Sequence, residues 1–188
     1  MKVIGLTGTI GAGKDIVRDM LEKKFNVKSV RLSDLIETAP LKKKKIRVTR
    51  KITQNLGDEL RQKYGGHVLA KIAVDLMKKR DRVKIIDGIR NPGEVEFFKE
   101  QFGDSFVLIG IDAPQDLRFQ RVLSRARELD PTKWEEFLVL DERDQGNDQP
   151  EYGQHVRRCM ELADVVLEND GNLEEFQKKV EEFIGQIS

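Results

Sequence analysis

Residues 2–15 of the chain read KVIGLTGTIGAGKD. The apolar residues at the start of this stretch predict a short buried strand, and the glycines that follow predict a loop. From Lys14 onward, apolar residues recur at helical spacing as far as Leu21, so a helix is expected directly after the loop. The stretch therefore predicts a strand, a glycine-rich loop and a helix in immediate succession.

The loop from Gly8 to Lys14 fits the P-loop pattern G-x-x-x-x-G-K. Glycine lets the backbone curl so that successive N–H groups point at phosphate oxygens, and the helix N-terminus adds partial positive charge. The lysine can then reach the outer phosphates of a nucleotide. The residues predicted to bind the cofactor from this loop are Gly8, Thr9, Gly11, Ala12, Gly13, Lys14 and Asp15.

Asp15 departs from the usual pattern, in which Ser or Thr follows the lysine and gives a hydroxyl to Mg²⁺. Either the loop does not bind a nucleotide, or the metal is held in another way. A carboxylate is a hard oxygen donor, so Asp15 is a candidate ligand for Mg²⁺ or for one of its waters. Its charge would repel the phosphates unless the metal lies between them.

The composition fits one domain, because 188 residues can bury a sizeable core. The net charge of +1 argues against a long groove for nucleic acid and gives no global attraction to membranes. No stretch is long and apolar enough to span a bilayer, and no signal peptide is expected. A single cysteine, Cys159, leaves no internal disulfide and fits a cytoplasmic protein.

A second informative stretch runs from Arg82 to Arg90, where an apolar strand ends in Asp87. Asp-Gly by itself is typical of a turn. Beside a P-loop, however, an aspartate at the end of a parallel strand can hold Mg²⁺ through water. Arg90 follows three residues later, where a planar guanidinium could bind a phosphate group.

Two further arginine-bearing segments are candidates for contacts with phosphate. Arg118, Arg121 and Arg125 share one predicted helix face, and Arg143 follows in an acidic stretch. A solvated surface is the simpler interpretation of such a pattern. Next to a phosphate site, it also fits a lid over residues 126–150 that closes over the nucleotide and excludes water.

The segment 38–66 is expected to bind the acceptor. It contains four consecutive lysines, which are typical of a solvated surface, and then Arg47 and Arg50. These two arginines fit either the same surface or a basic flap over an anionic substrate. Earlier in the chain, Ser33 or Asp34 is a candidate N-cap of a short helix after a strand that includes Val30 and Leu32.

Strands alternate with helices along the chain, which predicts right-handed βαβ units and a parallel sheet between helical layers. Ligands of such sheets bind beyond the carboxyl ends of the strands. The loop 8–15, Asp34, Asp87 and Arg90 are therefore expected to converge there.

With these motifs in place, the chain resembles the P-loop nucleoside-monophosphate kinase superfamily. Residues 5–14 are similar to the start of dephospho-CoA kinases, whereas Gly13-Lys14-Asp15 is similar to viral deoxynucleotide kinases. The segment DGIRNPGE, residues 87–94, resembles the D-x-R-x-P-x-E segment of deoxynucleotide kinases with one extra residue. Residues 163–171 resemble the end of both groups, where a turn lies near the adenine, which makes Asn169 and Gly171 candidate nucleotide-binding residues.

The resemblance implies a three-layer α/β/α P-loop kinase fold with a five-stranded parallel sheet, plus helical acceptor-binding and lid segments. It implies transfer of the γ-phosphoryl group of ATP to a small nucleotide-like acceptor, most like a (deoxy)nucleoside monophosphate. Lys14 would hold the donor, Asp87 and Asp15 the Mg²⁺, and Arg90 with Arg47 or Arg50 the acceptor. The residues expected to neutralise the transferring group are Arg121, Arg125 and Arg143.

Two alternatives stay open. A hydroxyl acceptor, as in dephospho-CoA kinases, needs a general base, and the resemblance gives that task to the carboxylate that aligns with Asp34. A P-loop ATPase or nucleotide-binding switch would have no small-molecule acceptor. The sequence contains no N/T-K-x-D stretch of the kind that G-proteins use to recognise the base.

Overall fold

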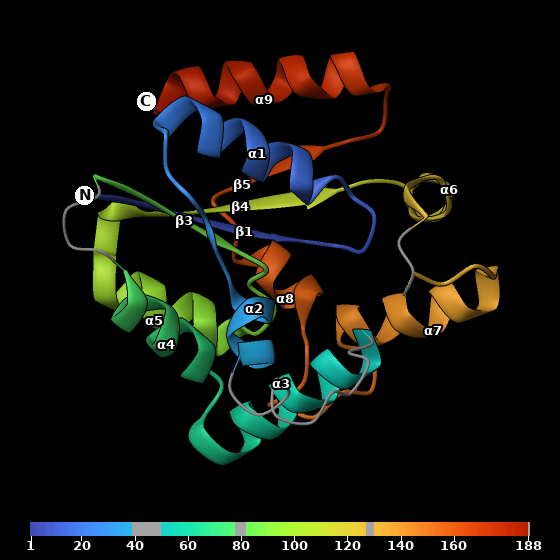
Figure 1. Cartoon of the computed structure of the whole chain (residues 1–188), viewed down its shortest axis with the longest axis horizontal. Coiled ribbons are helices and arrows are strands. Elements are labelled where there is room, and N and C mark those ends of the chain that lie inside the picture. Colours follow the sequence, from blue (N-terminus) through green and yellow to red (C-terminus); the bar gives the residue numbers. More distant parts are fainter. Residues whose placement is uncertain (39–49, 78–81, 127–129, 188) are drawn as a thin grey trace.

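The computed structural model describes residues 1–38, 50–77, 82–126 and 130–187 (Figure 1). Within these ranges the chain forms a parallel sheet between two helical layers. The expected α/β/α fold with a five-stranded parallel sheet is confirmed. The helices are α1 (Lys14–Phe25), α2 (Leu32–Thr38), α3 (Arg50–Tyr64), α4 (Val68–Leu76), α5 (Pro92–Phe102), α6 (Gln115–Arg125), α7 (Trp134–Gln145), α8 (Val156–Glu161) and α9 (Leu173–Ile187), with a 3-10 turn η1 (Gly103–Ser105).

The sheet has the order β2-β3-β1-β4-β5, and every pair of neighbours is parallel. Its strands are β1 (Lys2–Gly8), β2 (Val30–Arg31), β3 (Val83–Asp87), β4 (Phe106–Asp112) and β5 (Val165–Glu168). Leu6 of β1 is in register with Asp87 of β3. The glycine loop after β1 and the carboxylate at the end of β3 therefore leave the same edge of the sheet, where parallel sheets bind their ligands.

Alternate residues of the central strands serve the two faces of the sheet. Ile4 and Leu6 are buried against the layer of α1 and α9, whereas Val3 is buried in the cluster that includes α4 and α5 (Figure 1). The side chains of a strand point to opposite faces in turn, so a sheet covered on both sides needs apolar residues throughout. This explains why β1 is apolar without a polar alternation.

One local expectation was wrong. The second strand was expected to include Leu32, with Ser33 or Asp34 capping a later helix, but β2 ends at Arg31 and α2 begins at Leu32. Leu32 is buried in the core cluster, so its side chain is drawn inward as the first residue of the helix rather than as part of the strand. Ser33 and Asp34 thus lie inside the first turn of α2.

The predicted lid segment contains α7; the resemblance implied helical lid segments, although no periodicity in the sequence located this helix. In α7, Phe137 is fully buried and packs with Ile10 of the glycine loop and with Val122 of α6. Trp134 stacks on Phe137, with ring centroids 5.6 Å apart. A separate small core therefore fixes α7 beside the loop. Across the described ranges, no helix combines the length and hydrophobicity that a membrane span requires.

Candidate active site

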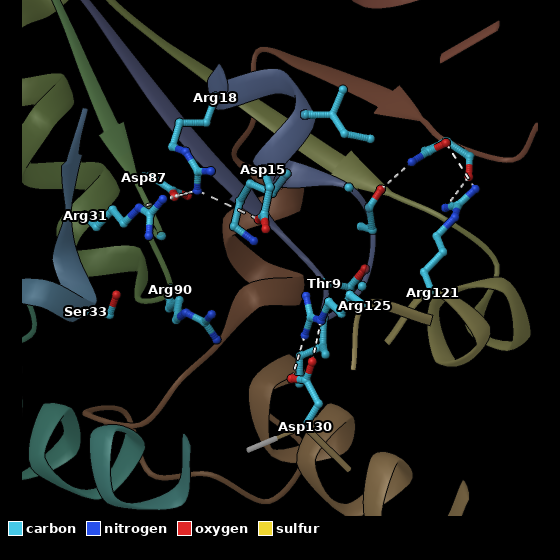
Figure 2. A pocket seen from close by; sticks show the side chains of 18 of the residues that line it. Thr9, Asp15, Arg18, Arg31, Ser33, Asp87, Arg90, Arg121, Arg125 and Asp130 are labelled. Atoms are coloured by element: carbon cyan, nitrogen blue, oxygen red, sulfur yellow. Dashed lines mark hydrogen bonds and ion pairs between the residues drawn. The ribbon is translucent and has the colours of Figure 1, made fainter. Parts of the chain in front are cut away.

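A cleft of about 1000 Å³ opens at the carboxyl edge of the sheet. Its walls come from the glycine loop and α1, from α2 and α3, from the turn after β3, from α6, and from the turn after β5. Figure 2 shows the charged side chains that face it. Residues far apart in the sequence thus meet at one place, as the alternation of strands and helices predicted.

The glycine loop takes a backbone conformation that other residues would strain. Gly11 and Gly13 have φ values of 80° and 99°, in the left-handed region that favours glycine. A Cβ on Gly13 would overlap the side-chain nitrogen of Asn169, which itself donates a 2.8 Å hydrogen bond to the carbonyl oxygen of Ala12. The backbone of the loop and the turn after β5 are therefore packed directly together.

The N-terminus of α1 faces the cleft without a side-chain cap. Gly13 occupies the N-cap position and makes no capping hydrogen bond through a side chain. Backbone N–H groups in the first turn of a helix lack partners inside the helix, and their dipoles favour an anion. Lys14 and Asp15 are the first helical residues and both line the cleft. This arrangement forms a cradle for phosphate oxygens.

Lys14 is held in a site that disfavours its own charge. Burial lowers the pKa of the Lys14 ammonium, and the carboxylates of Asp87 and Asp15 oppose this effect. The charge of Arg90 lowers the pKa further. A partly buried ammonium near a helix N-terminus is incompletely solvated, so an added anion would gain from pairing with it.

Asp87 lies among three charged residues at the end of β3 (Figure 2). One of its oxygens, Oδ2, accepts a 3.1 Å hydrogen bond from Arg18 and lies 3.8 Å from Nε of Arg31. The other oxygen, Oδ1, is buried and has no hydrogen-bond partner among the described residues. Asp15 lies on the far side of Arg18, 3.9 Å from its guanidinium.

The unpartnered Oδ1 of Asp87 provides a test of whether these residues fit Mg²⁺. A buried carboxylate oxygen without a hydrogen-bond partner destabilises the fold. A hydrated cation would give this oxygen a partner, either the metal itself or one of its waters. No cluster of three acidic, histidine or cysteine side chains able to hold a metal occurs in the ranges that the structure describes. Mg²⁺ in phosphoryl-transfer sites is commonly held by one or two carboxylates plus phosphates, so Asp87 and Asp15 fit this kind of site.

The glycine loop forms one side of the cleft, which we call the loop side. The turn after β5 lies at the far end of this side. Arg121 donates hydrogen bonds to the backbone oxygens of Asn169 and Gly171, at 2.9 and 3.2 Å. All three residues line the cleft, and the predicted contact of Asn169 and Gly171 with a nucleotide stays a prediction. Burial lowers the pKa of the Arg121 guanidinium. Arg121 thus ties α6 to the turn that the resemblance placed near the adenine.

The other predicted loop and arginine residues take different positions. Thr9 lines the cleft and donates a 2.7 Å hydrogen bond to Asp112. Gly8 does not line it, and a Cβ there would overlap the carbonyl oxygen of Ile111. Arg125 lines the cleft and pairs with Asp130 through two hydrogen bonds of 2.5 and 2.8 Å.

Arg118 was expected to share a face with Arg121 and Arg125, but its guanidinium is buried against Asp141 of α7. It also donates a 3.1 Å hydrogen bond to the carbonyl oxygen of Ile10 in the glycine loop. Its role is therefore to hold the loop and α7 together.

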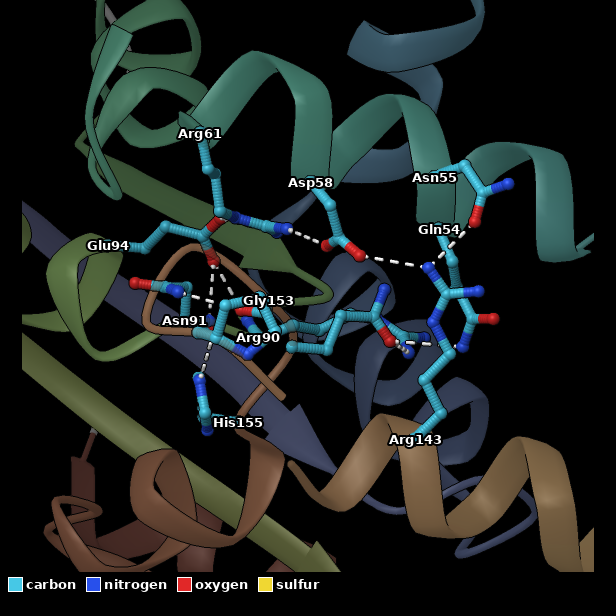
Figure 3. A network of polar contacts seen from close by, with 12 residues as sticks. Gln54, Asn55, Asp58, Arg61, Arg90, Asn91, Glu94, Arg143, Gly153 and His155 are labelled. Carbon is cyan, nitrogen blue, oxygen red and sulfur yellow. Dashed lines mark hydrogen bonds and ion pairs between the residues drawn. The ribbon is translucent and has the colours of Figure 1, made fainter. Parts of the chain in front are cut away.

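A network of ion pairs lies beside the cleft and connects α3, α5 and α7 (Figure 3). Arg143 of α7 donates a 2.9 Å hydrogen bond to Asp58 of α3, and Asp58 lies 3.4 Å from Arg61. Arg61 in turn donates to Glu94 of α5 at 2.8 and 3.0 Å. Arg143 does not line the cleft, so the structure places it in this network rather than with Arg121 and Arg125.

Arg90 belongs both to the cleft and to the network. It lines the cleft, and its guanidinium pairs with the fully buried Asp144 of α7. Its backbone N–H donates to Glu94, which caps α5, and its carbonyl oxygen accepts from the N–H of His155. The backbone of Arg90 is therefore fixed, and its side chain is placed between the cleft and α7.

Asp34 is exposed and is not among the residues that line the cleft. Arg47 lies outside the described residues, and Arg50 begins α3 without a described side chain. The expected contacts of these three residues with an acceptor stay predictions. The neighbouring residues Arg31 and Ser33 do line the cleft.

Several lining residues were missed by sequence reasoning. Arg18 stands four residues after Lys14, a position that carries no motif, although its spacing of three from Asp15 signals a helical ion pair. Gln54 and Gln154 lie 100 residues apart and meet through a 3.2 Å hydrogen bond. Only the fold brings them together, so no sequence signal indicated this pair.

Comparisons with known proteins support this fold and point to one family. No protein-family model matches the chain. A protein of Thermococcus onnurineus (strain NA1) named "UPF0200 protein" is 31% identical over 191 residues, which cover 98% of this chain and 97% of that protein.

Two solved structures share the fold at low sequence identity. The structure of TT1252 from Thermus thermophilus has a TM-score of 0.61 and 20% identity, and it covers 100% of this chain and 98% of its own. Shikimate kinase from Aquifex aeolicus has a TM-score of 0.54 and 18% identity, with 97% and 96% covered. The chain thus has the fold of a P-loop kinase.

Proposed function

The chain belongs to the UPF0200 family, and we propose that it is an ATP-dependent kinase. It transfers the γ-phosphoryl group to a small phosphorylated, nucleotide-like acceptor, most like a (deoxy)nucleoside monophosphate. The fold it shares with shikimate kinase supports a phosphotransferase in general. The nucleotide-like acceptor rests on the similarity of residues 87–94 to deoxynucleotide kinases and on the chemistry of the cleft.

The observation that carries the proposal is that one cleft contains both a phosphate cradle and a second polar pocket. Lys14 and the uncapped N-terminus of α1 lie at its centre. Asp87, in register with β1, lies next to them on β3. Beyond Asp87 the cleft continues to Arg31, Ser33 and Gln54. A donor and an acceptor can therefore meet over the carboxyl edge of β1 and β3.

On the donor side, the loop amides and Lys14 bind the β- and γ-phosphates of ATP. The turn at Asn169 and Gly171 borders the base, and Arg121 holds this turn against α6. Asn169 contacts the glycine loop directly, so the loop that binds the phosphates and the turn that borders the base are packed together. Positioning of this kind is the main contribution of proteins to phosphoryl transfer.

Asp87 and Asp15 are the residues that would hold Mg²⁺. When bound, the metal neutralises charge on the phosphate oxygens that develops during transfer. The contribution of the chain is to place Asp87, with its unpartnered Oδ1, in the same cleft as the phosphate cradle. The positive charge of Arg125 lies on the opposite wall of the cleft, where it can approach the transferring group once its pair with Asp130 opens.

On the acceptor side, charge decreases with distance from the loop. Arg31 and Arg90 lie near Asp87 and suit a phosphate group. Arg61 is already paired with Glu94, and the uncharged amides of Gln54 and Gln154, which hydrogen-bond to each other, line the cleft together with the apolar side chains of Ile36 and Leu69. Neutral donors and acceptors between apolar walls suit an uncharged planar head such as a nucleobase.

The exposed position of Asp34 bears on the choice of acceptor group. An acceptor phosphate is already ionised and needs no general base, whereas a hydroxyl does. Among the described residues that line the cleft, the carboxylates are Asp15, Asp87 and Asp130, and each has an arginine partner. This arrangement favours a phosphate acceptor over the hydroxyl chemistry of dephospho-CoA kinases.

The test is a phosphoryl-transfer screen with ATP and Mg²⁺ against nucleoside monophosphates, deoxynucleoside monophosphates and dephospho-CoA. We expect ADP release that depends on a nucleoside monophosphate. Asp34→Asn should keep near-normal turnover, whereas Asp87→Asn should lose it by about 100-fold or more. ATP hydrolysis that is indifferent to every acceptor would instead indicate a P-loop ATPase, and a collapse of Asp34→Asn with dephospho-CoA would indicate a hydroxyl acceptor.

A further inference from the structure

Asp15 puts a second carboxylate where P-loops usually have a hydroxyl, and the structure places a cation beside it. Arg18 follows one turn later on α1 and lies between Asp15 and Asp87 (Figure 2). A hydroxyl with Asp87 would give this site a charge of −1. Asp15, Asp87 and Arg18 together also give −1. The departure at position 15 is therefore matched by a charge of opposite sign three residues along the same helix.

The guanidinium of Arg18 is fixed from two sides. One terminal nitrogen, Nη1, donates the 3.1 Å hydrogen bond to Oδ2 of Asp87. The other two nitrogens, Nε and Nη2, both donate to Asp19, at 3.0 and 2.7 Å. The side chain of Arg18 is only 9% exposed, whereas that of Asp19 is 66% exposed and its charge is screened by water. Asp87, whose side chain is 9% exposed, therefore interacts with Arg18 in a much less solvated setting than Asp19 does, and Asp15, at 38%, lies between the two.

This contact also sets which oxygen of Asp87 is available. Oδ2 is occupied by Arg18, with Arg31 at 3.8 Å, while Oδ1 is buried and has no partner in the described part of the chain. A bound guanidinium fixes the rotation of a carboxylate, because turning it would break the hydrogen bond. The unpartnered oxygen is thus held in one direction before any metal arrives.

We propose that Arg18 is a positioning residue of the Mg²⁺–nucleotide site, which offsets the charge of Asp15 and fixes the carboxylate of Asp87, so that its unpartnered Oδ1 is the oxygen left for a metal. This inference rests on the proposed function. It explains how a P-loop can carry a carboxylate at position 15 and still accept a triphosphate. Arg18 does not touch the phosphates in this account. It acts through Asp87 and Asp15.

A double-mutant cycle tests this coupling. The four proteins are the wild type, Arg18→Gln, Asp15→Ser and the double variant, and the measurement is calorimetric binding of a non-hydrolysable ATP analogue without metal. Arg18→Gln removes the guanidinium that the two carboxylates share, although Arg31 still lies 3.8 Å from Asp87, so the affinity for the analogue should fall about 10-fold. Adding Asp15→Ser restores the charge of −1, so the double variant should return to within about 3-fold of the wild type.

Arg18→Lys separates charge from geometry. It keeps the positive charge but loses the planar fork, so it should bind the analogue without metal like the wild type. Mn²⁺ can replace Mg²⁺ in this experiment, and its binding is followed by its electron spin resonance signal. In the presence of the analogue, the variant should need several-fold more Mn²⁺ than the wild type for half-saturation. A purely structural role of Arg18 would lower the melting temperature of the variants without changing these two binding curves.

The outcomes separate this inference from the proposed function. If the wild type does not bind the ATP analogue at all, the proposed function fails first. If the wild type binds but the effects of Arg18→Gln and Asp15→Ser simply add, the coupling is absent and the role of Arg18 is wrong. If Arg18→Gln does not fold, Arg18→Lys with its unchanged charge still tests the geometric half, and an unchanged Mn²⁺ requirement overturns it.

Discussion

The loop side and the α3–α7 side of the cleft are built by different means. On the loop side, backbone geometry makes the site: Gly11 and Gly13 have positive φ, and the loop contacts Asn169 directly. On the α3–α7 side, side-chain ion pairs hold the helices, such as Arg61 with Glu94 and Arg143 with Asp58 (Figure 3). A backbone site recognises what all triphosphates share, whereas a side-chain site can be changed residue by residue to select one acceptor.

Gly13→Ala disturbs the backbone of the loop side and leaves the α3–α7 side unchanged. Gly13 has a left-handed backbone conformation, which is strained for alanine. A Cβ at this position would also overlap the side chain of Asn169. Such strain costs about 1–3 kcal/mol, and every 1.4 kcal/mol is tenfold in affinity, so binding of an ATP analogue should fall by up to about 100-fold in calorimetry.

Gly185→Ala is the matched control for this substitution. Gly185 lies in α9 on the outer surface, and a Cβ there would meet nothing within 4 Å. Alanine is favoured over glycine in helices by about 1 kcal/mol, so this variant should bind the analogue normally and melt at the same or a higher temperature. Equal binding by both variants would show that the loop backbone does not form the phosphate site.

The corresponding change on the acceptor side is Gln54→Leu. It removes the buried amide that meets Gln154, while the loop stays untouched. Losing one or two hydrogen bonds of about 1 kcal/mol should raise the KM for the best nucleoside monophosphate by about 3- to 10-fold. The affinity for the ATP analogue should not change. Gln62→Leu, on the exposed side of α3, is the control and should leave both constants unchanged.

A smaller effect is expected from the ion pair between Arg143 and Asp58. Burial raises the pKa of the Asp58 carboxyl, and the hydrogen bond from Arg143 opposes this. Removing only Arg143 leaves that carboxylate less compensated. Chemical unfolding of Arg143→Gln, Asp58→Asn and the double variant should give a coupling energy of about 0.5–3 kcal/mol. Additive effects would mean that the pair does not hold α7 to α3.

The smallest effect concerns Glu22, which lies near the C-terminal end of α1 and outside both the cleft and the ion-pair network. Burial raises the pKa of Glu22, but hydrogen bonds from Ser29 and Lys28 outweigh it and lower the value to about 2. Because the folded value lies below the ordinary 4.5, the stabilisation is complete above about pH 4.5 and is lost as the pH falls towards 2.

Glu22→Gln should therefore melt a few degrees below the wild type at neutral pH, and the difference should vanish near pH 2. Circular dichroism across this range measures it. A difference that stays constant with pH would assign the stability to packing instead of to the carboxylate.

The parallel sheet and the loop side could be predicted from the sequence because local patterns encode them. A continuous apolar run predicts a strand covered on both faces, and β1 and β4 are such strands. Glycines at positions 11 and 13 predict a curled backbone because few other residues take positive φ. The placement of Asp87 beside β1 followed from the rules of parallel sheets.

The α3–α7 side could not be predicted in the same way. The bond between Gln54 and Gln154 and the pair of Arg90 with Asp144 join residues that are far apart in the chain. Helical periodicity even gave a misleading result for Arg118, because the pattern shows which residues share a face but not which of them finds a buried partner in α7. Tertiary packing decides such cases.

The central claim is that the loop amides and Lys14 bind a magnesium-bound triphosphate, and calorimetry of ATP with Lys14→Ala tests it most directly. Removing the partly buried ammonium of the cradle should lower the affinity for Mg²⁺–ATP by at least about 100-fold and abolish phosphoryl transfer, while Lys24→Ala at the end of α1 should change neither. If Lys14→Ala keeps both the ATP affinity and the turnover of the wild type, the cleft is not a kinase site.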